Sequence, residues 1–120
     1  MSRSAWGHTV GESLTQKFEF IVNEKVFFTE AFRSDDRNSL KEHDFELILQ
    51  FYQDLIGRKT SRPLGEDLQF LLEMYCRGSV YMTVKWVLTG MKDSPAKMSK
   101  KLVEAMPPRL AAVFDELKLL

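Results

Sequence analysis

The sequence predicts an all-α fold, a helical bundle of five or six helices. Apolar residues recur at intervals of three and four along most of its 120 residues, and no stretch alternates apolar with polar residues as a half-buried strand does. The clearest punctuation is a short run in which Gly90 can end one helix in the left-handed conformation, and Ser94 can cap the next with Pro95 at its first position. We therefore expect helices joined by short turns.

Three helices are predicted in the N-terminal half. The first begins near Val10 and ends at Asn23, where a break precedes a short second helix. A charged, turn-rich loop at residues 33–39 supplies candidate caps for the third helix, in Asp35, Asn38 and Ser39, and Gly57 suits its end. The apolar stripes of the three helices are Leu14, Phe18, Ile21 and Val22; Val26, Phe27, Ala31 and Phe32; and Phe45, Ile48, Phe51, Tyr52, Leu55 and Ile56.

The longest predicted helix spans residues 64–89 and is apolar on two sides. One stripe holds Leu68, Leu71, Leu72, Tyr75, Ser79, Met82 and Trp86, and a less regular one holds Phe70, Met74, Tyr81, Val84 and Leu88. Such a helix must be covered on both sides, and in a domain this small its own neighbours cover only one. A helix from Ser94 follows, and Pro107-Pro108 breaks it before a last apolar segment that ends near Leu117.

Composition limits the class of protein. A length of 120 residues indicates one domain, 1–120, of which residues 1–8 are expected to be flexible. The 17 basic and 17 acidic residues balance, so no nucleic-acid surface is indicated. One cysteine excludes an internal disulfide and a multi-cysteine zinc site. No signal peptide or apolar membrane span is recognised, and we expect a cytoplasmic protein without membrane contact.

Candidate catalytic and metal-binding residues do not form a site. His43 lies among acidic residues, but neighbouring positions on a helix diverge around its axis and cannot close a metal site. Cys76 lies in the middle of the long helix, far from any predicted helix N-terminus, and is expected to be a packed or interface thiol. Motifs for nucleophilic serines or phosphate loops are absent. We expect no enzyme, no metal and no cofactor.

Aromatic residues are dense on the two central helices. Most are expected to pack the core and a dimer contact, but Tyr and Trp also have polar groups that need partners when buried. A small-molecule site in a helical bundle is commonly an aromatic-lined cavity between helices. We expect any such pocket between the third helix and the first half of the long helix, and its candidate ligand-binding residues are Phe51, Tyr52, Phe70, Tyr75 and Trp86.

Three strings carry a resemblance to a known family: FIVNEKVFF at 20–28, YCRGS at 75–79, and KWVLTGM at 85–91 leading to Ser94-Pro95. They resemble the C-terminal domain of TetR-type transcriptional regulators over about residues 12–114, closest to the subgroup that includes dihydroxyacetone-kinase regulators. The resemblance implies effector binding and a dimer built on the last two long helices. The candidate dimer residues are Met74, Gly78, Tyr81, Leu88, Met98 and Leu102.

Two hypotheses follow. The first is a regulatory dimerisation and effector-binding module, a homodimer whose partner is a small-molecule effector or another regulator. The second is a protein–protein adaptor or coactivator-type partner with a filled core and no ligand, as the resemblance also allows. No helix-turn-helix is recognised in the sequence, so we expect no direct DNA binding by this chain. An aromatic-lined pocket favours the first hypothesis, and densely packed central helices favour the second.

Overall fold

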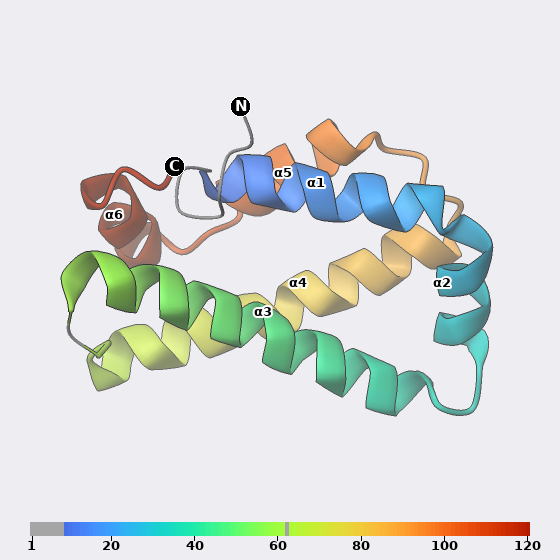
Figure 1. Ribbon diagram of the computed structural model, residues 1–120, viewed down its shortest axis with the longest axis horizontal. Coiled ribbons are helices and arrows are strands. Elements are labelled where there is room, and N and C mark those ends of the chain that lie inside the picture. Colours follow the sequence, from blue (N-terminus) through green and yellow to red (C-terminus); the bar gives the residue numbers. More distant parts are fainter. Residues whose placement is uncertain (1–8, 62) are drawn as a thin grey trace.

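The computed structural model describes residues 9–61 and 63–120, and these form six helices without a strand (Figure 1). The helices are α1 (Val10–Asn23), α2 (Lys25–Arg33), α3 (Arg37–Thr60), α4 (Glu66–Leu88), α5 (Pro95–Glu104) and α6 (Pro108–Glu116). The predicted all-α class is confirmed. The expectation that residues 1–8 are flexible falls outside the described residues.

Local signals place most helix ends. At the start of α1, the Thr9 hydroxyl accepts from the Glu12 N–H at 3.1 Å and the Glu12 carboxylate accepts from the Thr9 N–H at 3.0 Å, a reciprocal capping box. The predicted break at Asn23 is confirmed, because α1 ends there. Gly90 has a φ of +99°, and the Ser94 hydroxyl accepts from the Lys97 N–H at 3.1 Å, as predicted.

The ends of α3 differ from the prediction. The helix begins at Arg37 with Asp36 as its N-cap, so none of the three candidate caps is used. It also continues through Gly57 and ends only at Thr60, where Ser61 takes a φ of 56°. Gly57 lacks the left-handed conformation that ends a helix, and no proline interrupts the chain before Pro63. A single glycine is therefore tolerated within this helix.

Helices α1 and α5 lie side by side, and α3 and α4 pack beneath them (Figure 1). Helix α2 closes one end against α3 and α4, while α6 packs on α4 at the other end. The described chain measures 39 × 34 × 22 Å, and its shortest dimension corresponds to about two helix diameters. In a bundle this thin, each long helix keeps one face toward solvent.

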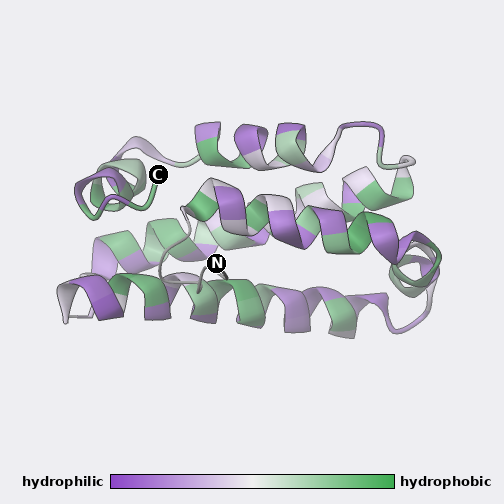
Figure 2. Cartoon of the chain, turned by 45° about the horizontal axis from the view of Figure 1, so that its top comes forward, coloured by the Kyte–Doolittle hydropathy of each residue, from purple (hydrophilic) through white to green (hydrophobic). Residues whose placement is uncertain are grey.

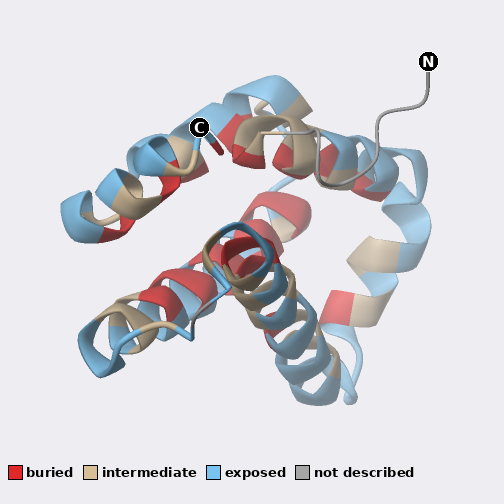
Figure 3. Ribbon diagram, turned by 60° about the vertical axis from the view of Figure 1, so that its left-hand side comes forward, coloured by how far each residue is buried: buried red, intermediate tan, exposed pale blue. Residues whose placement is uncertain are grey.

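Hydropathy follows this arrangement: apolar and polar residues occupy different sides of most helices (Figure 2), and the buried residues face inward (Figure 3). Large, fully buried side chains include Phe18, Tyr52, Leu72, Leu110 and Phe114.

Two assignments on α4 are corrected. Val84, expected on the uncovered stripe, is buried, whereas Met82, expected in the core, is 45% exposed. The neighbours of α4 give the reason: α2 and α3 both pack against α4, whereas Met82 lines the space between α4 and α5.

Candidate functional site

An apolar row lies on the solvent-facing side of α4. Phe70, Met74 and Tyr81 are 64%, 60% and 67% exposed, and their spacing of four and seven residues puts them on one side of the helix. Gly78 lies between Met74 and Tyr81, and a Cβ atom added there would meet nothing within 4 Å. We call these four residues the α4 face. Three large apolar side chains are therefore left uncovered by the chain's own helices.

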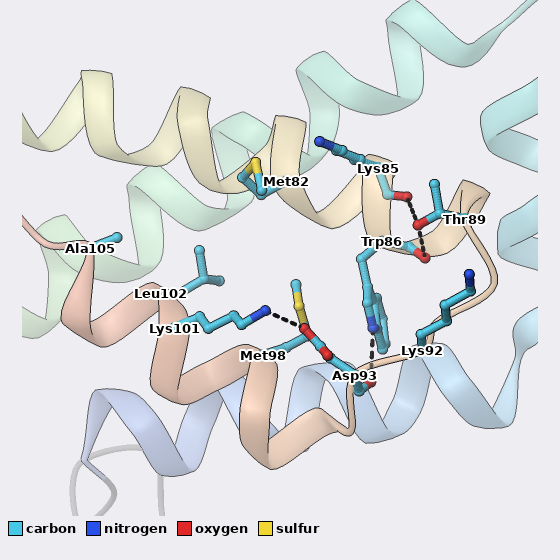
Figure 4. A pocket seen from close by; sticks show the side chains of 10 residues that line it. All are labelled: Met82, Lys85, Trp86, Thr89, Lys92, Asp93, Met98, Lys101, Leu102 and Ala105. Atoms are coloured by element: carbon cyan, nitrogen blue, oxygen red, sulfur yellow. Dashed lines mark hydrogen bonds and ion pairs between the residues drawn. The ribbon is translucent and has the colours of Figure 1, made fainter.

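A groove between α4 and α5 adjoins this face. Its larger hollow, of about 430 Å³, has an apolar floor that includes Trp86, Met98 and Leu102 (Figure 4). A second hollow, of about 290 Å³, is lined by Met74, Tyr75, Gly78, Ser79, Met82, Leu102, Ala105 and Pro107. The two hollows share Met82, Leu102 and Ala105, so together they form one groove, the α4–α5 groove.

Hydrogen bonds fix the walls of this groove. The Tyr75 hydroxyl donates to the Leu102 carbonyl at 2.5 Å and joins α4 to α5, and burial raises the pKa of Tyr75 to about 12. The Trp86 indole N–H donates to the Asp93 carbonyl at 2.9 Å, which holds the turn before α5 against the end of α4 (Figure 4). Both polar groups of these rings are thus satisfied within the chain.

The rim of the groove is basic. Lys85, Lys92 and Lys101 line the larger hollow together with Asp93. Lys101 Nζ lies 2.6 Å from Asp93 Oδ2, and this hydrogen-bonded ion pair holds the pKa of the Asp93 carboxyl below its usual value. One carboxylate therefore faces several lysines, so the rim suits an acidic group from outside.

Aromatic rings fill part of the space between α3 and the first half of α4. The Tyr52 ring lies 6.1 Å from the Tyr75 ring and 5.6 Å from the Phe114 ring of α6, measured between centroids. A hollow of about 470 Å³ remains where α3 ends and α4 begins, but none of the five candidate ligand residues lines it. Its lining is Gln53, Ile56, Gly57, Ser61, Pro63, Leu64 and Gln69.

A different cleft opens on the other side of α3, toward α1 and α2. It consists of two adjoining cavities of about 250 and 260 Å³, which share Lys17, Asp44 and Leu47. The first is also lined by Phe51 and Tyr52, and the second by aromatic rings of α1 and α2. We call the pair the α1–α3 cleft. Lys17 Nζ lies 3.1 Å from Asp44 Oδ1, and this ion pair lies in a mostly apolar lining that also includes Ser13, His43 and Thr83.

The candidate residues are therefore distributed over three places. Phe51 and Tyr52 reach the α1–α3 cleft, Tyr75 and Trp86 line the α4–α5 groove, and Phe70 stands apart on the outer side of α4. The candidate dimer residues lie on α4 and α5: Met74, Gly78 and Tyr81 on the α4 face, Met98 and Leu102 on the groove floor, and Leu88, half-buried, at the end of α4.

Sequence reasoning missed Lys17 and Asp44, which are separated by 27 positions along the chain. A pair on two different helices has no local signal, because only helix packing brings it together. Met82 was missed as a groove residue for a similar reason. Its position on α4 was known, but not the place of α5 beside it.

Reactive chemistry finds little support in the described residues. Cys76 is fully buried, and burial raises the pKa of its thiol to about 12, so the thiol stays protonated at neutral pH. Within residues 9–61 and 63–120, no three metal-ligating side chains come together. Among the described helices, none has the length and apolar character needed to cross a membrane.

The described residues thus form an all-helical bundle with an uncovered apolar face on α4, while the longest helix is α3, with 24 residues against 23 in α4. A family model described as transcriptional regulator C-terminal region, of the TetR type, matches residues 9–107. The chain belongs to this family, and the match takes in α1 to α5. Neither a curated protein nor a solved structure matches the chain.

Proposed function

We propose that this chain is the homodimeric regulatory module of a TetR-type regulator, with the α4 face and the α4–α5 groove as its dimer interface. The uncovered row of Phe70, Met74 and Tyr81 carries the proposal. Soluble monomers rarely leave such a row in water, and a two-fold pairing covers the same patch on both copies at once. The buried floor residues Met98 and Leu102 would then support the contact from α5.

The same proposal places a small-molecule effector in the α1–α3 cleft. The two adjoining cavities together fall within the size of common ligand sites, roughly 300–1,000 Å³, and their lining is mostly apolar. A ligand with a ring system and an uncharged hydrogen-bonding group suits them best. The Lys17–Asp44 pair offers both donors and an acceptor, and a charged ligand would unbalance it.

Two contacts of α1 would carry a structural change from the α1–α3 cleft to the proposed dimer interface. Away from the cleft, α1 joins α5 through the hydroxyls of Thr15 and Ser99, which lie 2.7 Å apart. The Phe18 ring of α1 packs edge-on against the Trp86 ring of α4 at 5.2 Å between centroids. A ligand that shifts α1 therefore acts on both helices that build the proposed dimer.

The adaptor function remains the second candidate, and the filled contact of Tyr52, Tyr75 and Phe114 favours it. In that case the chain pairs with a second copy or another regulator and binds no small molecule. The sequence strings at 20–28 and 85–91 support membership of the subgroup that includes dihydroxyacetone-kinase regulators, some of which act in this way. We further propose that this chain alone does not bind duplex DNA, since its charge is balanced.

Sedimentation equilibrium tests the proposed function directly. The unmodified chain should sediment at twice its 14.0 kDa mass at tens of micromolar. The interface should be of the obligate kind and bury on the order of 2,000 Å² or more in total. A 14.0 kDa species at these concentrations would overturn the proposal.

A further inference from the structure

The α4–α5 groove is basic at one end and uncharged at the other. The larger hollow, near the turn that leads into α5, is lined by Lys85, Lys92 and Lys101 together with one carboxylate, that of Asp93. The smaller hollow, beside the middle of α4, has a lining without a charged residue: Met74, Tyr75, Gly78, Ser79, Met82, Leu102, Ala105 and Pro107. Positive charge is therefore confined to one end of the groove.

Two of these lysines have no acidic partner within the described part of the chain. Lys101 Nζ lies 2.6 Å from Asp93 Oδ2 (Figure 4), and Lys97 Nζ lies 3.5 Å from Asp93 Oδ1, so the one carboxylate at this end already faces two lysines. Lys85 and Lys92 are exposed, and neither belongs to an ion pair between described residues. Their charges are available to an acidic group that enters the larger hollow.

The floor of the groove suits an apolar chain. The Tyr75 hydroxyl and the Trp86 N–H both donate to carbonyl groups of this chain, so neither ring offers a free donor to a polar ligand. Along α4 the two hollows run from Met74 to Thr89, which is ~22 Å at 1.5 Å per residue. A flexible apolar chain laid along this floor removes apolar side chains from water over that length.

We propose that the α4–α5 groove binds a free amphiphile with one acidic head group and one apolar chain, a molecule of the fatty-acid class. Its carboxylate lies near Lys85 and Lys92, and its chain runs along the floor toward Met74. Charge at one end only selects this class, because an acidic amphipathic helix carries charges along its length and the smaller hollow has no lysine to meet them. The α1–α3 cleft differs, since its Lys17 is already paired with Asp44.

Such a ligand also regulates the proposed dimer. This step rests on the proposed function, in which a second copy covers the same groove. An apolar chain seated over Met98 and Leu102 excludes the second copy from that floor, so the amphiphile and the second copy compete. Because both copies must release the ligand before they pair, the apparent dissociation constant of the dimer should rise about 100-fold when the ligand is present at ten times its own dissociation constant.

Isothermal titration calorimetry with decanoate, below the concentration at which it forms micelles, tests the site. The Phe70→Asp variant is titrated beside the unmodified chain, because Phe70 lines neither hollow and its replacement should remove the competing second copy. Decanoate should bind with a dissociation constant below about 1 mM. Octanoate, shorter by two methylene groups, should bind roughly tenfold more weakly, and acetate, which has the carboxylate without the chain, should give no measurable binding.

Matched substitutions separate the head group from the chain. Lys85→Gln combined with Lys92→Gln should weaken decanoate binding roughly tenfold or more, as the loss of charged hydrogen bonds does. Lys100→Gln removes a charge from an exposed position of α5 that lines neither hollow, and should change binding less than about threefold. Ala105 is exposed and borders both hollows, so Ala105→Trp should block the chain, while Ala112→Trp, on an exposed position of α6, should not. Circular dichroism checks that each variant folds, and the lysine variants decide if Ala105→Trp does not.

The outcomes separate the ligand site from the dimer. Decanoate binding that needs Lys85 and Lys92 supports the site. Binding that ignores these lysines, or no binding by either the unmodified chain or Phe70→Asp, overturns it, as does binding to phosphatidylglycerol vesicles without binding of free decanoate. In sedimentation, a dimer that decanoate dissociates supports the competition, and one that stays intact with decanoate bound overturns it. A monomer without ligand overturns the proposed function, while calorimetry still decides the site.

Discussion

Lys17 on α1 and Asp44 on α3 form an ion pair across the α1–α3 cleft, with Nζ 3.1 Å from Oδ1 and 3.4 Å from Oδ2. Their side chains are only 27% and 20% exposed, so both charges are partly removed from water. The pair thus ties together two helices that otherwise enclose apolar cavities.

Removing one member of this pair should cost more than removing both. Lys17→Met leaves the Asp44 carboxylate partly buried without its cation, and we expect a loss of about 1–3 kcal/mol in the free energy of unfolding. Lys17→Met combined with Asp44→Leu should recover most of that loss. Urea unfolding of the two variants measures the difference. A double variant no more stable than Lys17→Met would show that the charges do not act as a pair.

A charge on the α4 face should separate the proposed dimer. Phe70→Asp puts a carboxylate into the contact, which should weaken association by about 2 kcal/mol or more, roughly 30-fold. Phe27→Asp is the matched control, since Phe27 is 61% exposed and lies on a different helix, α2. Sedimentation velocity across a dilution series gives both dissociation constants. Equal constants for the two variants would mean that the α4 face is not the interface.

The sequence predicts those features of this fold that depend on neighbouring residues, such as helix ends. It does not predict features that depend on how distant helices pack, such as which side of a helix is buried. The break at Asn23, the turn at Gly90 and the cap at Ser94 are local and were predicted correctly. The Thr9–Glu12 capping box also has a local signature in the sequence, a threonine followed three positions later by glutamate.

Burial on α4 is the instructive failure. Periodicity identifies two apolar sides of a helix but does not say which neighbour covers which side. For this reason the predicted burial of Met82 and Val84 is the reverse of what the structure has: Val84 is buried and Met82 is exposed. The α1–α3 cleft was missed similarly: Phe51 and Tyr52 were expected to line a pocket toward α4, and they line one toward α1.

The two serines proposed as caps should behave differently when replaced. Ser94→Ala removes the side-chain oxygen that accepts from the Lys97 N–H, and we expect a loss of about 1 kcal/mol in unfolding free energy. Ser39→Ala is the control, because α3 begins before it, at Arg37. Its effect should stay within roughly 0.5 kcal/mol, as for other surface substitutions. Equal effects measured by thermal unfolding would contradict the assigned caps.

Alkaline pH should destabilise the domain through Cys76. Burial raises the pKa of its thiol from 9.0 to about 12, so the unfolded chain releases this proton first. Stability is therefore complete below pH 9 and falls as pH rises above it, by about 1.4 kcal/mol per pH unit for one group. Tyr75, whose pKa is raised from 10.0 to about 12, should add to the fall above pH 10. In urea titrations, Cys76→Ala should abolish the loss of unfolding free energy between pH 9 and 10. If the unfolding free energy of this variant falls with pH as steeply as that of the unmodified chain, Cys76 is not the cause.

The α1–α3 cleft should bind a small, mostly apolar molecule if the chain senses an effector. A ligand present at ~100 times its dissociation constant adds about 2.7 kcal/mol of stability, which a thermal-shift screen of uncharged ring compounds detects as a rise of roughly 10 °C. Leu47 borders both cavities, so Leu47→Trp should fill the cleft and remove the shift. Val26→Trp, on an exposed position of α2, should leave it unchanged. A ligand that still raises the unfolding temperature of Leu47→Trp must bind elsewhere. If the chain is a dimer and no compound raises its unfolding temperature, the adaptor function is favoured. The packing of Tyr52, Tyr75 and Phe114 between the central helices is consistent with that outcome.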